Sequence, residues 1–250
     1  MEKPLISVIT VVYNSEKFIE RTILSVINQS YTNIEYTIID GASTDNTVGI
    51  IKKYSKHLVY WMSEPDKGIY DAMNKGINHI HGKWIIFMNS GDVFHSNQVV
   101  ENVFHQNIPE NKLVIYGNTI VDYVRFQKIR IAANPSKLWK GMIFYHQSSF
   151  TRTDILKKYC FDISYHIAAE YNFFISIWDD FGEDVFYKTN IFISCYDFDG
   201  LSNVNRIKSL QERRKILKTK HLLSIAKQFY YLYLMLRTIV VLHVKKIIKA

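Results

Sequence analysis

The chain has 250 residues, a formal net charge of +8 and a hydrophobic fraction of 48%, which excludes a disordered or fibrous protein. At this length, one large α/β domain with a small appendage can bury most of its apolar surface without disulfides or a structural metal. The two cysteines, Cys160 and Cys195, lack metal-ligand spacing, so we expect free thiols in a reducing compartment and no zinc site.

The positive charge is concentrated at the C-terminal end of the chain. Residues 201–250 contain twelve lysines and arginines and one acid, Glu212, so this segment carries +11 and the first 200 residues carry −3. Nucleic-acid binding usually needs a basic folded surface, so we expect no nucleic-acid partner. The first residues show neither a charged leader before a long apolar core nor a small-residue cleavage site, so we expect a cytoplasmic protein without a signal peptide.

The first hundred residues alternate between strand and helix patterns. Four apolar, β-branched runs predict strands, at residues 5–12, 34–40, 58–62 and 84–88. Apolar residues that recur every three or four positions predict two helices, at residues 18–27 and 48–54. The side chains expected to cap these helices are Asn14, Ser15, Ser43 and Thr44. The alternation predicts right-handed βαβ units in a Rossmann-like α/β domain, with a mostly parallel central sheet that binds ligands at the carboxyl ends of its strands.

Residues 101–205 show a looser pattern, which we assign to the same domain because no repeat, low-complexity segment or proline-rich linker precedes them. Two strands are predicted at residues 113–116 and 119–125, around a turn at Gly117-Asn118. Further along, helices are predicted at residues 154–160 and 168–179, and another strand at residues 191–196.

Residues 206–250 contain no glycine or proline and are predicted to form an amphipathic helical tail. One face of its helical wheel carries Lys220, Lys227, Tyr231, Thr238, Lys245 and Lys249, and the opposite face carries Leu222, Ile225, Phe229, Tyr233, Leu236, Val240 and Ile247. Its most apolar stretch is interrupted by Arg237 and His243 and falls short of the roughly 20 apolar residues that span a bilayer. We therefore expect the helix to lie on an anionic membrane surface; the alternative is a helix packed on the domain with its lysines in water.

Polar residues follow three of the predicted strands. Tyr13 and Asn14 end the first strand, and Asp40 ends the second; there an acid can accept from a ribose hydroxyl and an aromatic ring can stack on a base, although such clusters also form ordinary turns. The fourth strand ends in Asn89-Ser90-Gly91-Asp92, where a carboxylate could hold Mg²⁺ or Mn²⁺ against a diphosphate. Neither a P-loop nor a Gly-x-Gly-x-x-Gly fingerprint occurs, so kinases and dehydrogenases have no support.

In chain order, these segments resemble the successive motifs of family 2 glycosyltransferases with the A-type nucleotide-sugar fold. The segments that carry the resemblance are residues 6–14, 38–45, 66–76 and 87–92, with a looser match at residues 146–150 and 167–174. The resemblance implies a glycosyltransferase domain at residues 1–205, with a donor-binding half at 1–100 and an acceptor-side half at 101–205. The basic tail at residues 206–250 lies outside it.

The resemblance also implies a donor and metal site. The positions that match nucleotide-sugar-binding residues are Val11, Tyr13, Asp40, Asp71, Asn89 and Asp92. Asn89 and Asp92 match the ends of the family's Asp-x-Asp motif, which makes Asp92 the ligand of Mn²⁺ or Mg²⁺. Asn89 and Gly91 stand where the family commonly has acids, so one carboxylate remains at the metal.

On the acceptor side, Glu170 falls where the family places its catalytic base. Ala169-Glu170 replaces the usual Glu-Asp pair, which moves the carboxylate outward by one methylene. His146, Gln147 and Ser202 are candidates to line the acceptor site, with the alternative that His146 is a hydrogen-bonded structural histidine.

The sequence thus favours an inverting hexosyl- or N-acetylhexosaminyltransferase. We expect it to use a UDP-sugar and a polyprenyl-diphosphate-linked saccharide acceptor in bacterial surface polysaccharide (O-antigen or capsule) biosynthesis, attached to the inner face of the cell membrane. The alternative is a non-catalytic nucleotide-sugar-binding or membrane-docking partner of a polysaccharide assembly complex. A nucleotidyltransferase would need a glycine-rich phosphate loop, which is not recognisable here.

Overall fold

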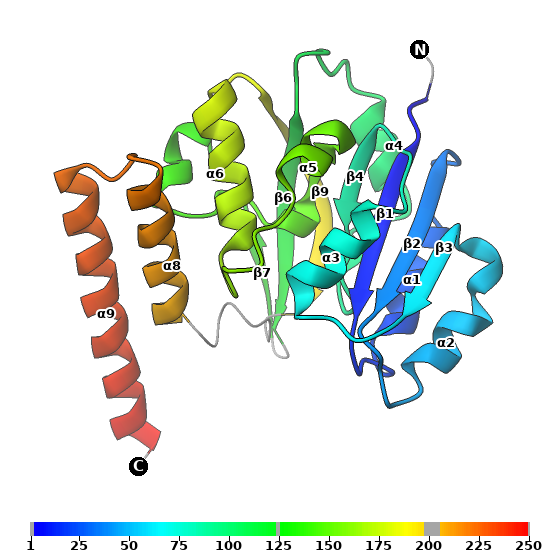
Figure 1. Cartoon of the computed structure of the whole chain (residues 1–250), viewed down its shortest axis with the longest axis horizontal. Helices are drawn as coiled ribbons and strands as arrows, with labels where there is room; N and C mark the ends of the chain where they lie inside the picture. The colour runs from blue at the N-terminus through cyan, green and yellow to red at the C-terminus, as the bar shows by residue number, and fades with distance from the viewer. Residues whose placement is uncertain (1–2, 124–125, 198–205, 250) are drawn as a thin grey trace.

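A computed structural model describes residues 3–123, 126–197 and 206–249, which form an α/β fold around one twisted sheet (Figure 1). In the described residues the strand order is β3-β2-β1-β4-β8-β6-β9-β5, with β7 paired to β6. The strands are β1 (Ile6–Val12), β2 (Ile34–Asp40), β3 (Tyr60–Ser63), β4 (Trp84–Phe87), β5 (Val93–Phe94), β6 (Val114–Tyr123), β7 (Phe126–Arg130), β8 (Ser149–Arg152) and β9 (Phe186–Asp197).

The first four strands confirm the predicted parallel sheet. β1 pairs in parallel with both β2 and β4, and β2 pairs in parallel with β3. Their carboxyl ends therefore meet at one edge, where Figure 1 shows the arrowheads of β1, β2 and β3 together. Beyond β4 the sheet is mixed, because β8 runs antiparallel to both β4 and β6 while β9 runs parallel to β6.

Helices cover both faces of the sheet. Successive side chains of a strand point to opposite faces, so apolar residues on each face need a cover. In β1, Ile6 and Val8 belong to one hydrophobic cluster, whereas Ile9 and Val11 belong to another. The first cluster packs under α1 (Ile19–Ile27), α2 (Thr47–Lys53) and α4 (Val99–Phe104), and the second under α3 (Ile69–Ile77), α5 (Thr153–Tyr159) and α6 (Ala169–Phe181). Short 3-10 turns lie at η1 (Ser55–His57), η2 (Pro135–Lys140) and η3 (His146–Ser148).

Gly117 is not the hairpin turn that the sequence predicted. β6 is one continuous strand, and its pairing with β9 shifts register around this glycine. A Cβ at Gly117 would lie 2.5 Å from the carbonyl oxygen of Ile191, so a side chain has no room there. The glycine therefore permits close approach of β9 within a strand, rather than a reversal of the chain.

The predicted helix caps are also wrong. Neither α1, which follows Phe18, nor α2, which follows Asn46, has a side-chain cap hydrogen bond. Asn14 and Ser43 instead form hydrogen bonds that join the ends of β1 and β2, since the backbone N–H of Asn14 donates to Ser43 Oγ at 2.8 Å. These polar residues organise the loops of the candidate site.

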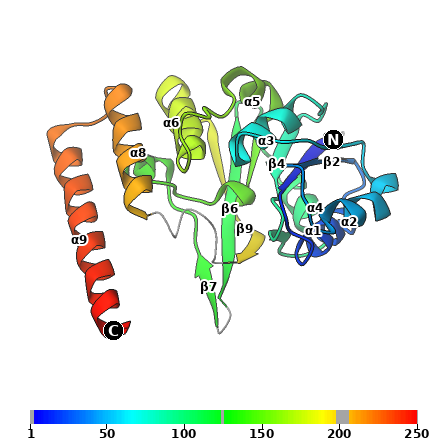
Figure 2. The same cartoon turned by 60° about the horizontal axis from the view of Figure 1, so that its bottom comes forward.

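The C-terminal segment is helical, as predicted, but it forms two helices. α8 (Arg206–Thr219) and α9 (Ile225–Lys249) lie antiparallel, side by side, at the edge of the molecule away from β3 (Figures 1 and 2). The chain turns at His221, which has a φ of 56°. Leu210, Ile216 and Leu217 of α8 are buried in the same cluster as α3 and α6, so α8 is packed on the core.

Helix α9 contacts the domain through the face on which the wheel placed its lysines. Tyr231 and Thr238 are buried, and the Tyr231 hydroxyl donates to the carbonyl oxygen of Trp139 at 2.9 Å. The opposite face exposes large apolar side chains, namely Ile225, Phe229, Leu232, Tyr233, Leu236, Ile239, Val240 and Val241, which we call the α9 apolar face. Within the described residues, no helix combines the length and hydrophobicity needed to cross a bilayer.

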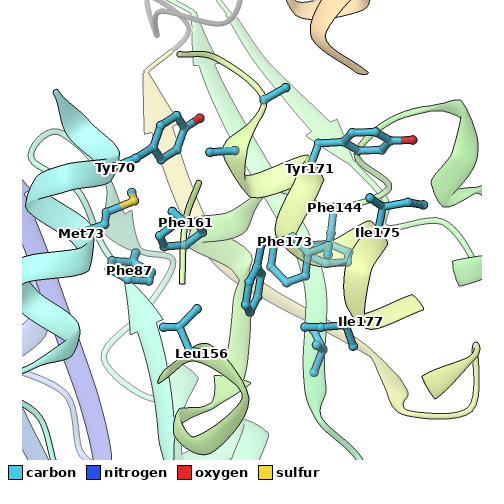
Figure 3. Packing of buried hydrophobic residues seen from close by; sticks show 14 of the residues in the cluster. Tyr70, Met73, Phe87, Phe144, Leu156, Phe161, Tyr171, Phe173, Ile175 and Ile177 are labelled. Carbon is cyan, nitrogen blue, oxygen red and sulfur yellow. The ribbon is translucent and has the colours of Figure 1, made fainter. Parts of the chain in front are cut away.

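The second hydrophobic cluster forms the base on which the candidate site rests. Figure 3 shows its aromatic side chains converging from β4, α3 and α6, with Tyr70 and Tyr171 at the same end of the cluster. The ring centroids of Phe161 and Phe173 are 5.4 Å apart, and those of Phe144 and Phe174 are 4.8 Å apart. Such aromatic packing gives rigid support to the helices that carry the polar residues above it.

Candidate active site

Hydrogen bonds tie the carboxyl ends of β1, β2 and β4 into one polar edge. The N–H of Ser90 donates to the carbonyl oxygen of the buried Val11 at 3.1 Å, and the hydroxyls of Ser15 and Ser90 lie 2.7 Å apart. Asn14 Oδ1 accepts from the N–H of Thr44 at 2.8 Å. The three polar segments predicted from the sequence are therefore adjacent in space.

Tyr13 and Asp40, the predicted base and ribose residues, differ sharply in exposure. Tyr13 is 62% exposed, so its ring is free to stack on a flat ligand. Asp40 is fully buried, and its carboxylate accepts from the Ser43 N–H at 2.9 Å and from the Ser63 hydroxyl at 2.6 Å. The structure therefore places Asp40 where it fixes the loop after β2, directly behind the strand end.

The block before α3 contributes a carboxylate that the sequence did not single out. A Cβ at Gly41 would meet both Asp66 Oδ2, at 2.4 Å, and the Tyr13 ring, at 3.4 Å, so Asp66 and Tyr13 flank this glycine. Asp71, the acid predicted from this block, instead accepts from the N–H of Lys67 at 3.0 Å. It does not line the pocket of about 440 Å³ that contains Asn89 and Asp92. The sequence did not indicate that Asp71 would lie in the first turn of α3 and that Asp66 would lie beside Gly41.

A pocket of about 440 Å³ opens between β4, η3, α6 and α8. It brings together most of the residues predicted for metal binding and catalysis. The residues that line it include Tyr70, Asn89, Asp92, His146, Gln147, Glu170, Tyr171 and Arg213. Ser202, the remaining predicted acceptor-side residue, lies outside the described residues.

One end of the pocket carries oxygen atoms suited to a hard cation. Asn89 Oδ1 and Gln147 Oε1 are buried and have no hydrogen-bond partner, and Gln147 Nε2 lies 3.5 Å from Asp92 Oδ1. Unsatisfied buried oxygens are costly, and oxygen ligands are those that Mg²⁺ and Mn²⁺ prefer. No group of three His, Cys, Asp or Glu side chains that could hold a metal occurs in the described part of the chain. Asp92 with the two amide oxygens therefore fits a cation that completes its coordination with substrate oxygens.

Glu170 lies in the first turn of α6 and is linked to the metal end through His146. Glu170 Oε1 is 3.0 Å from His146 Nδ1, and Asn89 Nδ2 is 3.1 Å from His146 Nε2. Burial alone would lower the pKa of His146, but the Glu170 carboxylate, helped by Asp92, outweighs burial and raises it. The histidine thus connects the predicted base with Asn89.

Helix α8 contributes two residues that sequence reasoning did not assign to the site, Glu212 and Arg213. The Glu212 carboxylate accepts from three successive N–H groups, of His166, Ile167 and Ala168, at 3.3, 3.0 and 2.9 Å. This loop leads directly into α6, so Glu212 fixes the approach to Glu170. The sequence offers a signal for this residue, since Glu212 is the one acid in residues 201–250, which contain twelve lysines and arginines.

Charged side chains of both α6 and α8 act on the phenol of Tyr70. Burial raises the pKa of its phenol, the Glu170 and Glu212 carboxylates raise it further, and the Arg213 guanidinium opposes them. The Tyr70 hydroxyl donates to the carbonyl oxygen of Ile167 at 3.0 Å, which keeps it neutral and in place. The charges of Glu170, Glu212 and Arg213 therefore all act on Tyr70.

The fold is that of the A-type nucleotide-sugar glycosyltransferases. TarS of S. aureus, solved with UDP-GlcNAc, superposes with a TM-score of 0.70 at 17% identity over 86% of this chain and 65% of that one, so the chain spans just under two thirds of that structure. Glucosyl-3-phosphoglycerate synthase from Mycobacterium tuberculosis, solved with Mn²⁺ and UDP-glucose, gives a TM-score of 0.62 at 16% identity over 89% and 81% of the two chains. At these identities the likeness concerns the fold.

The sequence comparisons specify the family. The model of glycosyl transferase family 2 matches residues 7–170, and the chain belongs to that family. An uncharacterized glycosyltransferase of Mycobacterium tuberculosis is 33% identical over 178 residues, 69% of this chain and 68% of that protein. A Bacillus subtilis glycosyltransferase named for teichuronic acid biosynthesis is 40% identical over 95 residues, 36% of this chain and 37% of that one.

Proposed function

We propose that this glycosyltransferase moves a hexosyl or N-acetylhexosaminyl group from a UDP-sugar to a hydroxyl of a saccharide acceptor, with inversion at the anomeric carbon. The observation that supports the proposal is a pocket that is lined by Glu170 and also by Asn89, Asp92 and Gln147. The base takes the proton that the acceptor hydroxyl loses, and a cation balances the negative charge that develops on the departing diphosphate. The UDP-sugar seen in the TarS structure supports this donor class.

The proposal gives each of these side chains a role that its position supports. Glu170 accepts the proton of the acceptor hydroxyl as that oxygen attacks the anomeric carbon. Asp92, with the amide oxygens of Asn89 and Gln147, holds Mn²⁺ or Mg²⁺ against the diphosphate. When bound, the cation neutralises the charge that develops on the leaving group. Tyr13 stacks on the uracil, while Val11, Asp40 and Asp71 shape and anchor the donor-side loops.

The acceptor in this proposal is a polyprenyl-diphosphate-linked saccharide used in bacterial surface polysaccharide biosynthesis. The teichuronic acid relative supports this class of polymer. The α9 apolar face supports a membrane-bound acceptor, since Phe229 is 67% and Leu236 is 64% exposed on a helix that also exposes Arg237. Attachment at the inner face of the cell membrane would bring the pocket to the lipid-linked substrate.

Transfer can be tested by incubating the protein with Mn²⁺, a panel of UDP-sugars and short lipid-linked saccharides while measuring UDP release. We expect release that depends on both acceptor and metal, and loss of release in Asp92→Ala. No release with any donor, together with unchanged UDP binding in Asp92→Ala, would favour the non-catalytic alternative and refute transferase activity. Tyr13→Phe, which keeps the exposed ring, serves as the matched control for the donor side.

Membrane attachment can be tested separately with point variants of the α9 apolar face. Deleting α9 would also remove Tyr231 from the core, so Phe229→Ser combined with Leu236→Ser is the cleaner change. We expect this pair to release the protein from phosphatidylglycerol vesicles without loss of transfer to soluble acceptors. Ile131→Ser is the control, because Ile131 is 63% exposed but lies after β7. Full retention of the double variant on vesicles would disprove attachment through this face.

A further inference from the structure

The α8 wall of the pocket carries a cation for which the described residues provide no acidic partner. Arg213 lines the pocket, and its Nε is buried without a hydrogen-bond partner. Among the described side chains no carboxylate pairs with it; its one polar contact is the face of the Tyr171 ring, 5.7 Å from the guanidinium carbon. A half-buried guanidinium without an anion is unfavourable unless a ligand supplies the charge.

The surrounding structure keeps a space open for this guanidinium. Gly141 has a φ of +136°, and a Cβ there would lie 2.7 Å from Arg213 Nη1. A side chain at this position would meet the guanidinium, so Gly141 leaves room for it. Arg213 therefore lies at the pocket wall, beside Gly141 and over the Tyr171 ring.

The position of Arg213 belongs to the acceptor side of the pocket. Its charge acts on Tyr70 together with that of Glu170, and also on Tyr171. Tyr13 and Asp40, by contrast, lie at the ends of β1 and β2, and Figure 1 shows α8 at the opposite edge of the molecule from β2 and β3. An anion at Arg213 would therefore lie beside the predicted base, away from the nucleotide loops.

We propose that Arg213 forms a binding site for a phosphate group of the acceptor. This inference rests on the proposed function and narrows its substrate class to saccharides that carry a phosphate near the accepting sugar. The planar guanidinium offers two parallel N–H donors that match two phosphate oxygens. The phosphate at Arg213 then orients the sugar so that its hydroxyl meets Glu170.

The experiment measures ligand binding by calorimetry in the presence of UDP and Mn²⁺, which occupy the donor side. Glucose 1-phosphate and inorganic phosphate are the charged probes, and methyl glucoside is the uncharged one. We expect Arg213→Gln to raise the Kd of both charged probes at least tenfold, and Arg213→Lys to raise it less because the charge remains. Lys218→Gln removes an exposed charge from the same helix and is expected to change each Kd less than twofold.

Four outcomes would overturn this assignment. Failure of the unaltered chain to bind either charged probe, or equal binding by Arg213→Gln, would make Arg213 a packing residue. An equal rise in the Kd of UDP would assign it to the donor diphosphate. Loss of phosphatidylglycerol vesicle binding with unchanged probe binding would assign it to a lipid headgroup. Arg213→Lys, together with the melting temperature of each variant, separates lost binding from lost folding.

Failure of the proposed function gives a different result. In that case no donor is consumed by any variant, whereas the binding difference between Arg213→Gln and Lys218→Gln is unaffected because it requires no turnover.

Discussion

The two halves of the pocket are built in different ways. On the donor side, the polar residues come from short segments that directly follow β1, β2 and β4, and the parallel register brings them together. On the acceptor side, His146, Glu170 and Arg213 come from η3, α6 and α8, which meet only through packing of the second hydrophobic cluster. The donor-side arrangement can be predicted from short sequence segments, whereas the acceptor-side arrangement depends on how the completed fold packs.

This contrast implies that substitutions in the two halves should have separable effects. Changes at the strand ends should weaken nucleotide binding, whereas changes on η3, α6 and α8 should reduce turnover or acceptor use at unchanged nucleotide affinity.

The largest effect is expected from removing the base. Glu170→Gln keeps the shape of the side chain but cannot accept a proton, so kcat should fall by ~10²–10⁴-fold, the usual contribution of general base catalysis. The Kd of UDP should change less than twofold, which calorimetry can measure. Asp179→Asn, an exposed change on the same helix, is the control and should leave both values unaltered. Near-normal turnover in Glu170→Gln would refute the assignment.

Tyr13→Ala tests the donor side. Loss of an aromatic ring that stacks on a base costs ~1–3 kcal/mol, so the Kd of UDP should rise about 5- to 100-fold. The ring is largely exposed, so the melting temperature should stay within about a degree of that of the unaltered chain. Tyr13→Phe should bind UDP normally, and equal weakening in both variants would show that the hydroxyl, not the ring, makes the contact.

Glu212→Gln tests whether α8 positions the catalytic loop. The amide retains one acceptor oxygen but loses the charge-assisted hydrogen bonds to the loop before α6, so the free energy of unfolding should fall by ~1–3 kcal/mol. We also expect a roughly tenfold lower kcat, in line with misplacement of a base, with no change in the Kd of UDP. Glu183→Gln, an exposed change beyond α6, provides the control; a rise in the Kd of UDP would show that the two halves are not separable.

The smallest effect on activity is expected at Glu35, a buried carboxylate of β2 away from the pocket. Burial tends to raise its pKa, but hydrogen bonds from Ser7 and from the N–H groups of His81 and Gly82 outweigh burial and lower it below 4.5. Its stabilising contribution is therefore present above pH 4.5 and is lost as the pH falls through the lowered folded-state pKa. Glu35→Gln should flatten the acid limb of unfolding curves measured by circular dichroism and leave kcat unchanged.

The donor half was largely predictable because its signals are local. Strand 34–40 and the starts of helices α1 and α2 agree with the sequence pattern to within about one residue. The predicted caps failed because Asn14 and Ser43 have a second option, hydrogen bonding to each other's loops, which depends on parallel strands being adjacent. The polar character of these segments indicated that the residues belong to the site, but it did not indicate which residues they hydrogen-bond to.

The acceptor half was less predictable for two physical reasons. Gly117 has the composition of a turn, but the need for it arises from β9, more than seventy residues later. The sequence predicts residues 206–250 as a tail outside the domain because lysines and arginines dominate the pattern of this segment. Helix α8 contributes Arg213 to the pocket and Glu212 to the loop before α6. Both contributions depend on packing of Leu210, Ile216 and Leu217, which a helical wheel of one segment does not reveal.

The contact between Glu212 and the loop before α6 has a consequence for synthesis of the protein. Three N–H groups at residues 166–168 receive their acceptor only after some forty-five further residues have been added. A nascent chain can therefore assemble its nucleotide loops early, yet the loop that presents Glu170 lacks its anchor until α8 leaves the ribosome. We therefore expect the loop before α6 to reach its final position only after α8 has been made and has packed against the domain.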